Sequence, residues 1–121
     1  MGVNAELEFD VIKARADGKV LTVVVMMRNT TDKKVKRTFL VKDVFFIDDK
    51  GEKKYFVLTD NSGRALVSSL DSNNKSRMSV EVPANGKKLI WMKFPAPSEN
   101  TRSVDLTLPV ALPFDRLAVQ R

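Results

Sequence analysis

Most of this chain consists of short stretches in which apolar and polar residues alternate, and this two-residue period predicts β-strands. The alternation is regular over residues 7–11, 78–82 and 104–108. Two further runs, 19–27 and 89–94, are apolar at most positions, and their β-branched and aromatic side chains favour strands over helices. Turn residues separate seven to nine such segments at intervals of roughly 8–12 residues, which is typical of an antiparallel sandwich or barrel.

The segment 41–58 predicts a β-hairpin around which the other strands are organised. Two β-rich runs flank a polar turn, so the expected loop has roughly four to six residues. The first run presents apolar side chains to both of its faces, with Phe45 and Ile47 on one and Val44 and Phe46 on the other. This pattern predicts a central strand that is covered on both sides, or a strand at the junction of two sheets.

One domain with one core is expected, because the chain shows no repeat, no low-complexity segment and no internal linker. Two sheets would bury the inward side chains of the predicted strands between them. The expected core contains Leu21, Val23, Val25, Phe45, Ile47, Val80, Val82 and Leu106.

Three features interrupt the strand pattern. Ile12 breaks the phase of the first strand and predicts a β-bulge or a switch between sheets. Residues 64–70 fit either a short helix or a strand. Pro109 and Pro113 confine the last stretch to a sheet edge or an irregular path, in which residues 117–119 form a short closing strand.

The composition is that of an ordinary globular domain. The chain has 121 residues, of which 43% are apolar and 30% are charged. No apolar run approaches the roughly 20 residues of a membrane-spanning helix. We expect a single domain over residues 1–121, in which residues 1–4 are disordered or an expression remnant, and we find no signal peptide at its start.

The chain contains neither cysteine nor histidine. Disulfides, thiolate metal sites and cysteine nucleophiles are therefore excluded. The lack of histidine removes the commonest general base and the commonest transition-metal ligand. A Ser-His-Asp triad, a Cys-His dyad and a structural zinc site cannot form, so we expect no cofactor and no transition metal.

Three segments together resemble a known family. They are VLTVVVMMRNTTDKKV (20–35), FFIDDKGEKKYFV (45–57) and VEVPANGKKLIWMKFPAP (80–97). Their order is similar to that of a bacterial immunoglobulin-like family of unknown function, which occurs in lipoproteins and in secreted or surface proteins and is related to the mycobacterial immunoprotective extracellular antigen. The resemblance covers roughly residues 5–119. It implies an all-β, immunoglobulin-like antiparallel β-sandwich of seven to nine strands, a periplasmic, cell-envelope or secreted location, and no catalytic residues.

The turn at residues 85–86 has two interpretations. A tight hairpin would pair the two flanking strands and place Trp91 on their shared face. A crossover between sheets, which the resemblance implies, would leave Trp91 on an outer face and turn Ile90, Met92 and Phe94 inward. We favour the crossover, because Phe94 is a better core anchor than Lys93.

Basic residues outnumber acidic ones by 21 to 15, which gives a net charge of +6. They gather in two clusters on either side of the predicted central strand, Lys33, Lys34, Lys36 and Arg37 before it and Lys50, Lys53 and Lys54 after it. Ten residues of extended chain separate the clusters by roughly 30 Å, so they do not form one compact phosphate-binding patch. A solvated surface is the favoured interpretation, and contact with a polyanion is the alternative.

Other candidate sites also have simpler interpretations. Acidic residues in three loops (Asp48, Asp49 and Glu52; Asp60 and Asn61; Asp71 and Asn73) could supply oxygen ligands to calcium, but the spacing of a calcium loop is absent, and turn formation is favoured. Ser68, Ser69, Ser72 and Ser79 have no histidine beside them, although a Ser-Lys dyad with Lys75 is conceivable. Trp91 fits a core or sheet-junction position better than a ligand platform.

The favoured hypothesis is a non-catalytic immunoglobulin-like interaction or accessory module that acts through its loops or an edge strand. Its expected partner is a protein of the cell envelope, and nucleic acid is not an expected partner. Membrane contact would require an anchor before residue 1, and the sequence leaves the oligomeric state open. The alternative is a basic module that binds nucleic acid or another polyanion, and a hydrolase with unrecognised groups ranks third.

Overall fold

The computed structural model describes residues 7–51, 53–71, 74–109 and 114–121. Over these residues it contains nine strands and one turn of 3-10 helix, which confirms the predicted all-β class. The elements are β1 (Leu7–Asp17), β2 (Val20–Asn29), β3 (Val35–Leu40), η1 (Val41–Asp43), β4 (Phe45–Asp48), β5 (Lys54–Phe56), β6 (Arg77–Val82), β7 (Lys87–Pro95), β8 (Ser103–Thr107) and β9 (Phe114–Ala118). None of the described helices is long and apolar enough to cross a membrane.

The strands pair into a three-stranded sheet, β1-β2-β7, a four-stranded sheet, β5-β4-β8-β9, and a two-stranded ribbon, β3-β6. Every pair of named strands is antiparallel. In immunoglobulin domains strands A, B, E and D form one sheet, and strands C, F and G form the other. The pairing of β1, β2 and β7 and of β4, β8 and β9 follows that arrangement, so the fold is the predicted immunoglobulin-like antiparallel sandwich.

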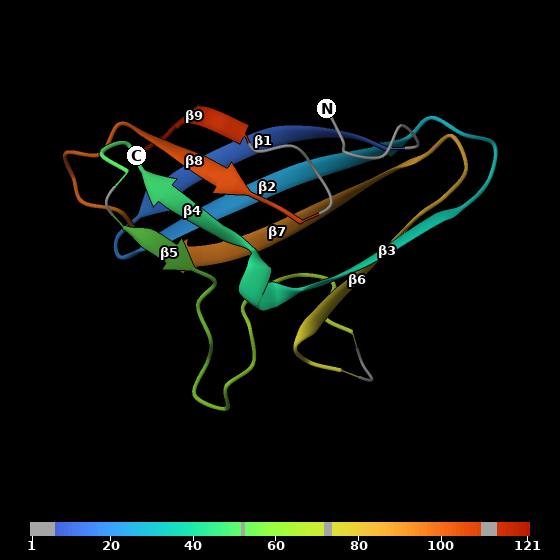
Figure 1. Cartoon of the computed structure of the whole chain (residues 1–121), viewed down its shortest axis with the longest axis horizontal. Helices are drawn as coiled ribbons and strands as arrows, with labels where there is room; N and C mark the ends of the chain where they lie inside the picture. The colour runs from blue at the N-terminus through green and yellow to red at the C-terminus, as the bar shows by residue number, and fades with distance from the viewer. Residues whose placement is uncertain (1–6, 52, 72–73, 110–113) are drawn as a thin grey trace.

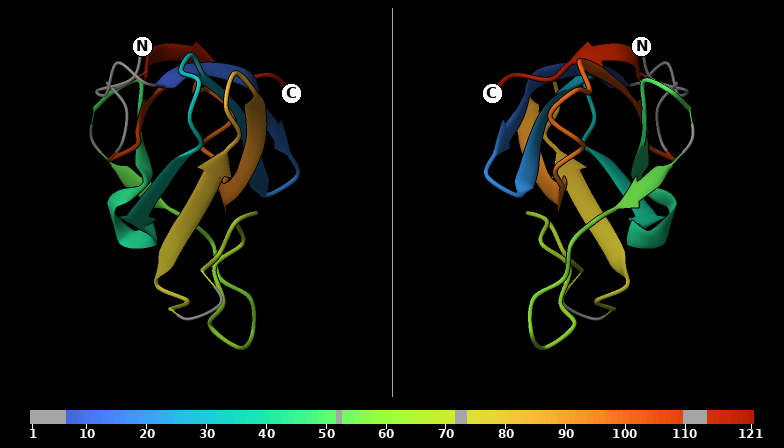
Figure 2. Two further views of the ribbon diagram at one scale, coloured as in Figure 1. Left: turned by 90° about the vertical axis from the view of Figure 1, so that its right-hand side faces the viewer. Right: turned by 90° about the vertical axis from the view of Figure 1, so that its left-hand side faces the viewer.

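The second layer of the sandwich is made of two parts. In Figure 1 the long strands β1, β2 and β7 run along the molecule, with β4, β5 and β8 at one end and the β3–β6 ribbon at the other. Figure 2 shows the two layers from the ends of the molecule. The chain passes from the ribbon to the four-stranded sheet through η1, which closes with a 3.0 Å hydrogen bond from Val44 N to Val41 O. The ribbon and the four-stranded sheet are therefore separate parts of the second layer, and we call the division between them at η1 the seam.

Six of the eight expected core residues are buried: Leu21, Val23, Val25, Val80, Val82 and Leu106. On β2 every second side chain, from Leu21 to Asn29, is buried, and the side chains between them are half-buried. This is expected for a strand that has only one face on the core. Phe45 and Ile47 are only half-buried, so the prediction for these two residues is wrong.

Phe46 on β4, and Val44 just before this strand, are the buried residues instead. Phe46 stacks on Tyr55 with ring centroids 4.4 Å apart and meets the edge of Phe94, from the facing sheet, at 5.3 Å. Phe45 lies on the outer surface of the same strand. Both faces of this strand are apolar, so its sequence pattern could not choose between them, and the aromatic partners across the sandwich decide which face turns inward.

The crossover before Trp91 is confirmed. β6 pairs with β3, and β7 pairs with β2, so the turn at 83–86 joins strands of different layers. Met92 and its inward neighbours Ile90 and Phe94 are buried, whereas Trp91 is 40% exposed, so the interpretation of Trp91 as a core residue is wrong. Gly86 donates its N–H to Pro83 O, and a Cβ on Gly86 would lie 2.6 Å from Pro83 Cγ, so this tight turn requires glycine.

This arrangement predicts that Met92→Ala destabilises the protein more than Trp91→Phe does. Truncation of a fully buried methionine typically costs about 2–5 kcal/mol, because it leaves a cavity. Trp91→Phe removes area that is partly in contact with water and should cost about 1 kcal/mol or less. Denaturant unfolding of both variants measures the two costs. Equal costs, or a blue-shifted Trp91 emission that resists acrylamide quenching, would contradict the assigned strand faces.

Asn29, the last residue of β2, connects the turns at one end of the sandwich. Its buried side-chain Nδ2 donates to Lys33 O at 2.7 Å and to Val82 O at 3.1 Å. Its Oδ1 accepts from Thr31 N at 2.9 Å and from Thr31 Oγ1 at 2.7 Å. One amide therefore ties the β2–β3 turn to the end of β6.

The other local predictions had mixed outcomes. The ladder between β1 and β2 shifts register at Val11/Lys13, which confirms the bulge at Ile12. Residues 64–70 form neither a helix nor a strand, only isolated bridges to neighbouring segments. The closing strand is present as β9, next to β8, but it begins at Phe114 and ends at Ala118, before the predicted Val119. Pro113, Glu52, Ser72, Asn73 and residues 1–6 lie outside the described residues.

Candidate binding groove

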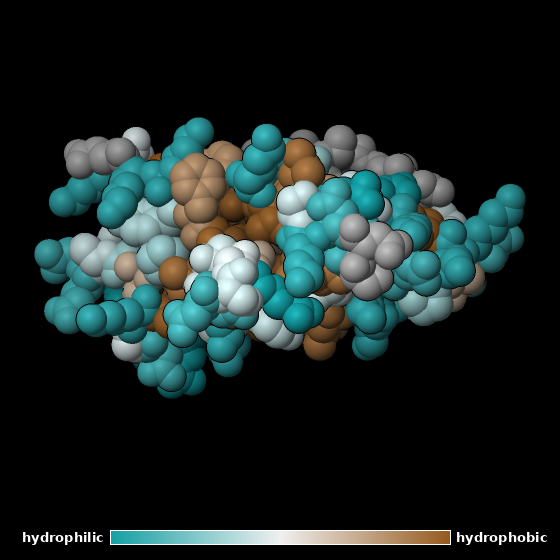
Figure 3. Space-filling view, turned by 90° about the horizontal axis from the view of Figure 1, so that it is seen from below, coloured by the Kyte–Doolittle hydropathy of each residue, from teal (hydrophilic) through white to brown (hydrophobic). Residues whose placement is uncertain are grey.

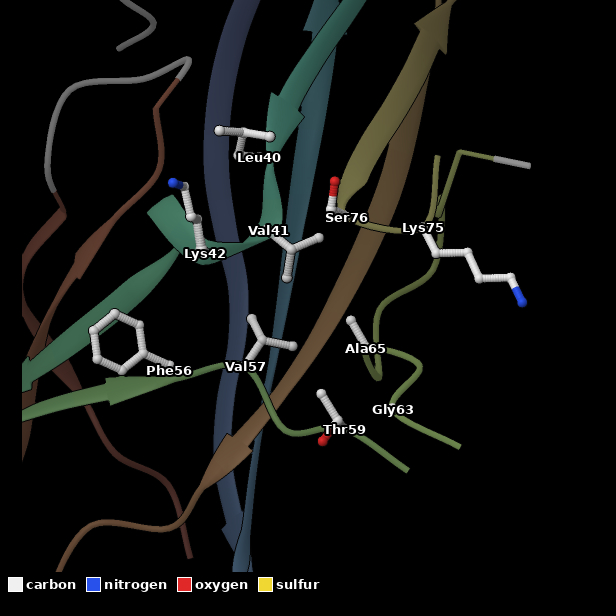
Figure 4. A pocket seen from close by; sticks show the side chains of 10 residues that line it. All are labelled: Leu40, Val41, Lys42, Phe56, Val57, Thr59, Gly63, Ala65, Lys75 and Ser76. Atoms are coloured by element: carbon white, nitrogen blue, oxygen red, sulfur yellow. The ribbon is translucent and has the colours of Figure 1, made fainter. Parts of the chain in front are cut away.

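An open groove of about 540 Å³ lies at the seam of the second layer. One wall comes from the end of β3 and from η1, and the facing wall comes from the end of β5 and the loop that follows it (Figure 4). The lining residues are Leu40, Val41, Lys42, Phe56, Val57, Thr59, Gly63, Ala65, Lys75 and Ser76.

The groove exists because two chain segments diverge. On one side η1 moves the chain from β3 to β4, and Val41 N donates to Ser76 O at 2.9 Å. On the other side the chain leaves β5 and crosses to the first sheet, where Leu58 N donates to Lys93 O at 2.9 Å. Side chains of both segments therefore line the opening between these walls.

The loop wall is held by its own hydrogen bonds. Asp60 Oδ1 accepts from Ser62 Oγ at 2.7 Å and from Arg64 N at 2.9 Å, and these bonds lower the pKa of the Asp60 carboxyl. Thr59 and Ala65 form an antiparallel bridge behind this turn. Ala65 and Thr59 are thereby fixed on the groove side of the loop.

The floor of the groove is apolar. Figure 4 shows the side chains of Val41, Val57 and Ala65 pointing toward one another across it. At its rim Leu40 is 36% exposed and Phe56 is 49% exposed. Figure 3 shows hydrophobic side chains gathered in a hollow on this side of the molecule. Exposed apolar groups around a hollow are typical of a binding site.

The polar groups of the groove lie at its margins. Lys42 and Lys75 are on opposite sides of the opening in Figure 4, and both side chains extend away from the floor. The hydroxyl groups of Thr59 and Ser76 complete the polar lining. No aspartate or glutamate is among the ten residues that line the groove. The groove therefore offers apolar contact and positive charge to an occupant.

A second exposed apolar area lies on the outer face of the first sheet. Leu89 is 53% exposed there, next to Trp91 on β7, and Lys93 Nζ lies 5.9 Å from the centroid of the Trp91 ring. Met26 is opposite Leu89 on β2, and Val24 is opposite Trp91. Because strands of one sheet form this area, it lacks the facing walls that the groove has.

The structure does not bring the two predicted basic clusters together. The two clusters lie at opposite ends of the molecule (Figure 1). The first is in the β2–β3 turn and on β3 (Lys33, Lys34, Lys36 and Arg37), and the second is in the β4–β5 hairpin (Lys50, Lys53 and Lys54). Glu81 compensates part of the first cluster, since it lies opposite Lys36 on the β3–β6 ladder and 3.9 Å from Lys34 Nζ.

Two lysines of the second cluster cover aromatic rings. Lys53 Nζ lies 5.0 Å from the ring centroid of Tyr55, and Lys54 Nζ lies 4.7 Å from that of Phe45. Such contacts let the aliphatic stems shield apolar surface while the ammonium groups stay in water. The sequence pattern does not indicate this structural role of Lys53 and Lys54.

The other candidates take part in local structure. Asp60 forms a turn, Asp49 Oδ2 accepts from Arg102 N at 3.0 Å, and Asp71 pairs with Arg77 at 3.0 Å. Within the described residues, no three acidic side chains gather in a way that could hold a metal ion. Ser68 Oγ accepts the N–H of Trp91 at 3.0 Å, which fixes the loop to β7.

No protein-family model matches this chain, and no curated protein matches it at a significant level. Among solved structures, the secreted protein MPT63 of Mycobacterium tuberculosis is 13% identical, with 95% of this chain and 81% of MPT63 covered, at a TM-score of 0.45. Two structures of the GH20 exo β-N-acetylglucosaminidase of Vibrio harveyi are 13% and 14% identical, at TM-scores of 0.42 and 0.39.

The alignments to the glycosidase cover 96% of this chain but only 18% of the enzyme chains. At identities and TM-scores this low, none of these structures indicates a function for this chain. The immunoglobulin-like fold rests on the strand pairing itself. Membership in the bacterial immunoglobulin-like family that the sequence resembles stays a prediction.

Proposed function

We propose that this chain is a non-catalytic binding module of an exported or cell-envelope protein, and that the groove at the seam of its second layer is the binding site. The groove itself carries this proposal. It combines an apolar floor, an exposed apolar rim and an opening large enough for a small ligand or an apolar segment of a partner. The exported or envelope location is supported by the sequence resemblance.

Burial of the rim provides the driving force. An occupant that covers Leu40 and Phe56 removes apolar surface from water, which contributes about 25 cal/mol for each Å². The walls are held by backbone hydrogen bonds at Val41 and Leu58, so little ordering is needed when the occupant binds. The lining residues supply contact, two ammonium groups and two hydroxyls, which suits binding better than proton transfer.

Polyanion binding stays an alternative prediction. The net charge of +6 favours it. The separation of the two basic clusters and the pairing of Lys34 with Glu81 do not support a single polyanion surface. The apolar groove, in contrast, has both a hollow shape and exposed apolar surface.

The neutral apolar dye N-phenyl-1-naphthylamine tests the proposal, because its fluorescence rises in an apolar environment. We expect one saturable site per chain. Thr59→Phe places a bulky ring in the groove from an exposed lining position and should weaken dye binding about tenfold or more. Thr22→Phe, on the outer face of the first sheet, is the matched control and should leave the dye affinity unchanged. Lack of dye binding, or loss only in the Thr22→Phe protein, would contradict the proposal.

A further inference from the structure

Resting on the proposed function, we propose that the occupant of the groove is a free linear amphiphile with one anionic headgroup, a long-chain carboxylate. Its hydrocarbon chain lies along the floor formed by Val41, Val57 and Ala65. Its carboxylate stays at the opening, in water, and Lys42 and Lys75, whose side chains extend outward on opposite margins in Figure 4, make the electrostatic potential there positive.

The charge of the lining selects the sign of the headgroup. Two of the ten lining residues are lysines, and none is acidic. Asp43 follows Lys42 in η1 and is exposed, but it does not line the groove. An anionic headgroup is therefore attracted to the margins, and a cationic headgroup of the same chain length is repelled.

The open shape selects a headgroup that stays hydrated. Burial of a carboxylate would be costly without close partners, and an open groove avoids that cost because the headgroup remains in water. The ammonium groups also lie at the solvent margin, so their contribution is modest and depends on salt. Most of the affinity comes from the chain, and the lysines discriminate between headgroups.

A single free amphiphile fits this groove better than a membrane surface does. Surface binding to anionic lipid uses protruding apolar groups together with clusters of several basic residues. Here most apolar lining lies below the rim, and only Leu40 and Phe56 are strongly exposed. The two lysines stand on opposite margins instead of forming a cluster (Figure 4).

Displacement of N-phenyl-1-naphthylamine measures this selectivity, with all amphiphiles below their micelle concentrations. Dodecanoate is expected to displace the dye, and decanoate, which is two methylenes shorter, to bind roughly fifteenfold more weakly, since each buried methylene contributes about fourfold. Dodecyltrimethylammonium should bind at least about tenfold more weakly than dodecanoate. The Lys42→Met/Lys75→Met protein should lose about three- to tenfold in dodecanoate affinity and keep its affinity for the dye and for dodecanol.

The Lys33→Met/Lys34→Met protein is the matched control, because it removes the same charge at the far end of the molecule, and its dodecanoate affinity should be unchanged. Equal displacement by dodecanoate and dodecyltrimethylammonium would overturn the anionic ligand but leave the binding groove intact. Lack of dye binding to the unmodified chain would overturn both. Co-sedimentation with phosphatidylglycerol vesicles without added fatty acid, lost in Lys42→Met/Lys75→Met, would overturn the free amphiphile in favour of a membrane surface.

Discussion

A Val25→Asp protein is expected not to fold. Val25 is buried on the inward face of β2, the central strand of the first sheet. A carboxylate at this position has no cationic partner among the apolar side chains of the core cluster. Burial of an unpaired charge costs several kcal/mol, which is comparable with the whole stability of a domain of this size. Far-ultraviolet circular dichroism and denaturant titration should show loss of the cooperative transition.

Val24→Asp is the matched control on the neighbouring residue of β2. Val24 points to the outer face, where it lies opposite Lys13 on β1 and opposite Trp91 on β7. A carboxylate there remains in water beside a lysine, so a loss of about 1 kcal/mol or less is expected. A folded Val25→Asp protein with a normal unfolding transition would contradict the assigned phase of β2.

Asn29→Asp is expected to destabilise the domain by about 3 kcal/mol, although the two side chains have nearly the same shape. The substitution removes both hydrogen bonds that Nδ2 donates, and it places a carboxylate against Lys33 O and Val82 O. A buried acceptor that loses its donor costs about 1–3 kcal/mol, and charge repulsion adds to this cost. The thermal midpoint should fall by roughly 10 °C.

Asn74→Asp controls for the chemistry of the substitution. Asn74 Oδ1 accepts from Ser76 N at 3.0 Å in a local turn similar to that of Asn29, but Asn74 is exposed. A carboxylate can accept the same bonds there, as Asp60 does from Ser62. The expected change is within about 0.5 kcal/mol. Equal effects of Asn29→Asp and Asn74→Asp would contradict the role assigned to the buried amide.

The sequence was sufficient to predict most strands because each of them buries one face. On β6 a clean alternation of apolar and polar residues identified the inward side chains. On β7 the choice between two strand faces depended on whether Phe94 or Lys93 would enter the core, and burial of Phe94 confirmed the choice. On β4 both faces are apolar, so only the contacts of Phe46 with Tyr55 and Phe94 could determine the inward one.

The groove could not be predicted from the sequence. Its walls come from residues 40–42, 56–65 and 75–76, which are far apart in sequence. They face each other across an opening because the chain turns at η1 on one side and crosses to the first sheet at Leu58 on the other. The segment 64–70 gave no clear helix or strand pattern, and it forms part of one wall as irregular chain. The basic clusters were visible because their residues are adjacent in sequence, but adjacency did not reveal that Lys53 and Lys54 cover aromatic rings.

The most direct test of the central claim is a map of amide chemical-shift changes in the ¹⁵N-labelled protein during titration with N-phenyl-1-naphthylamine. The binding groove predicts that the largest changes fall on residues 40–42, 56–59, 63–65 and 75–76, on both walls of the seam. Changes centred on Leu89 and Trp91 would instead assign binding to the outer face of the first sheet. That result would contradict the groove as the binding site of this module.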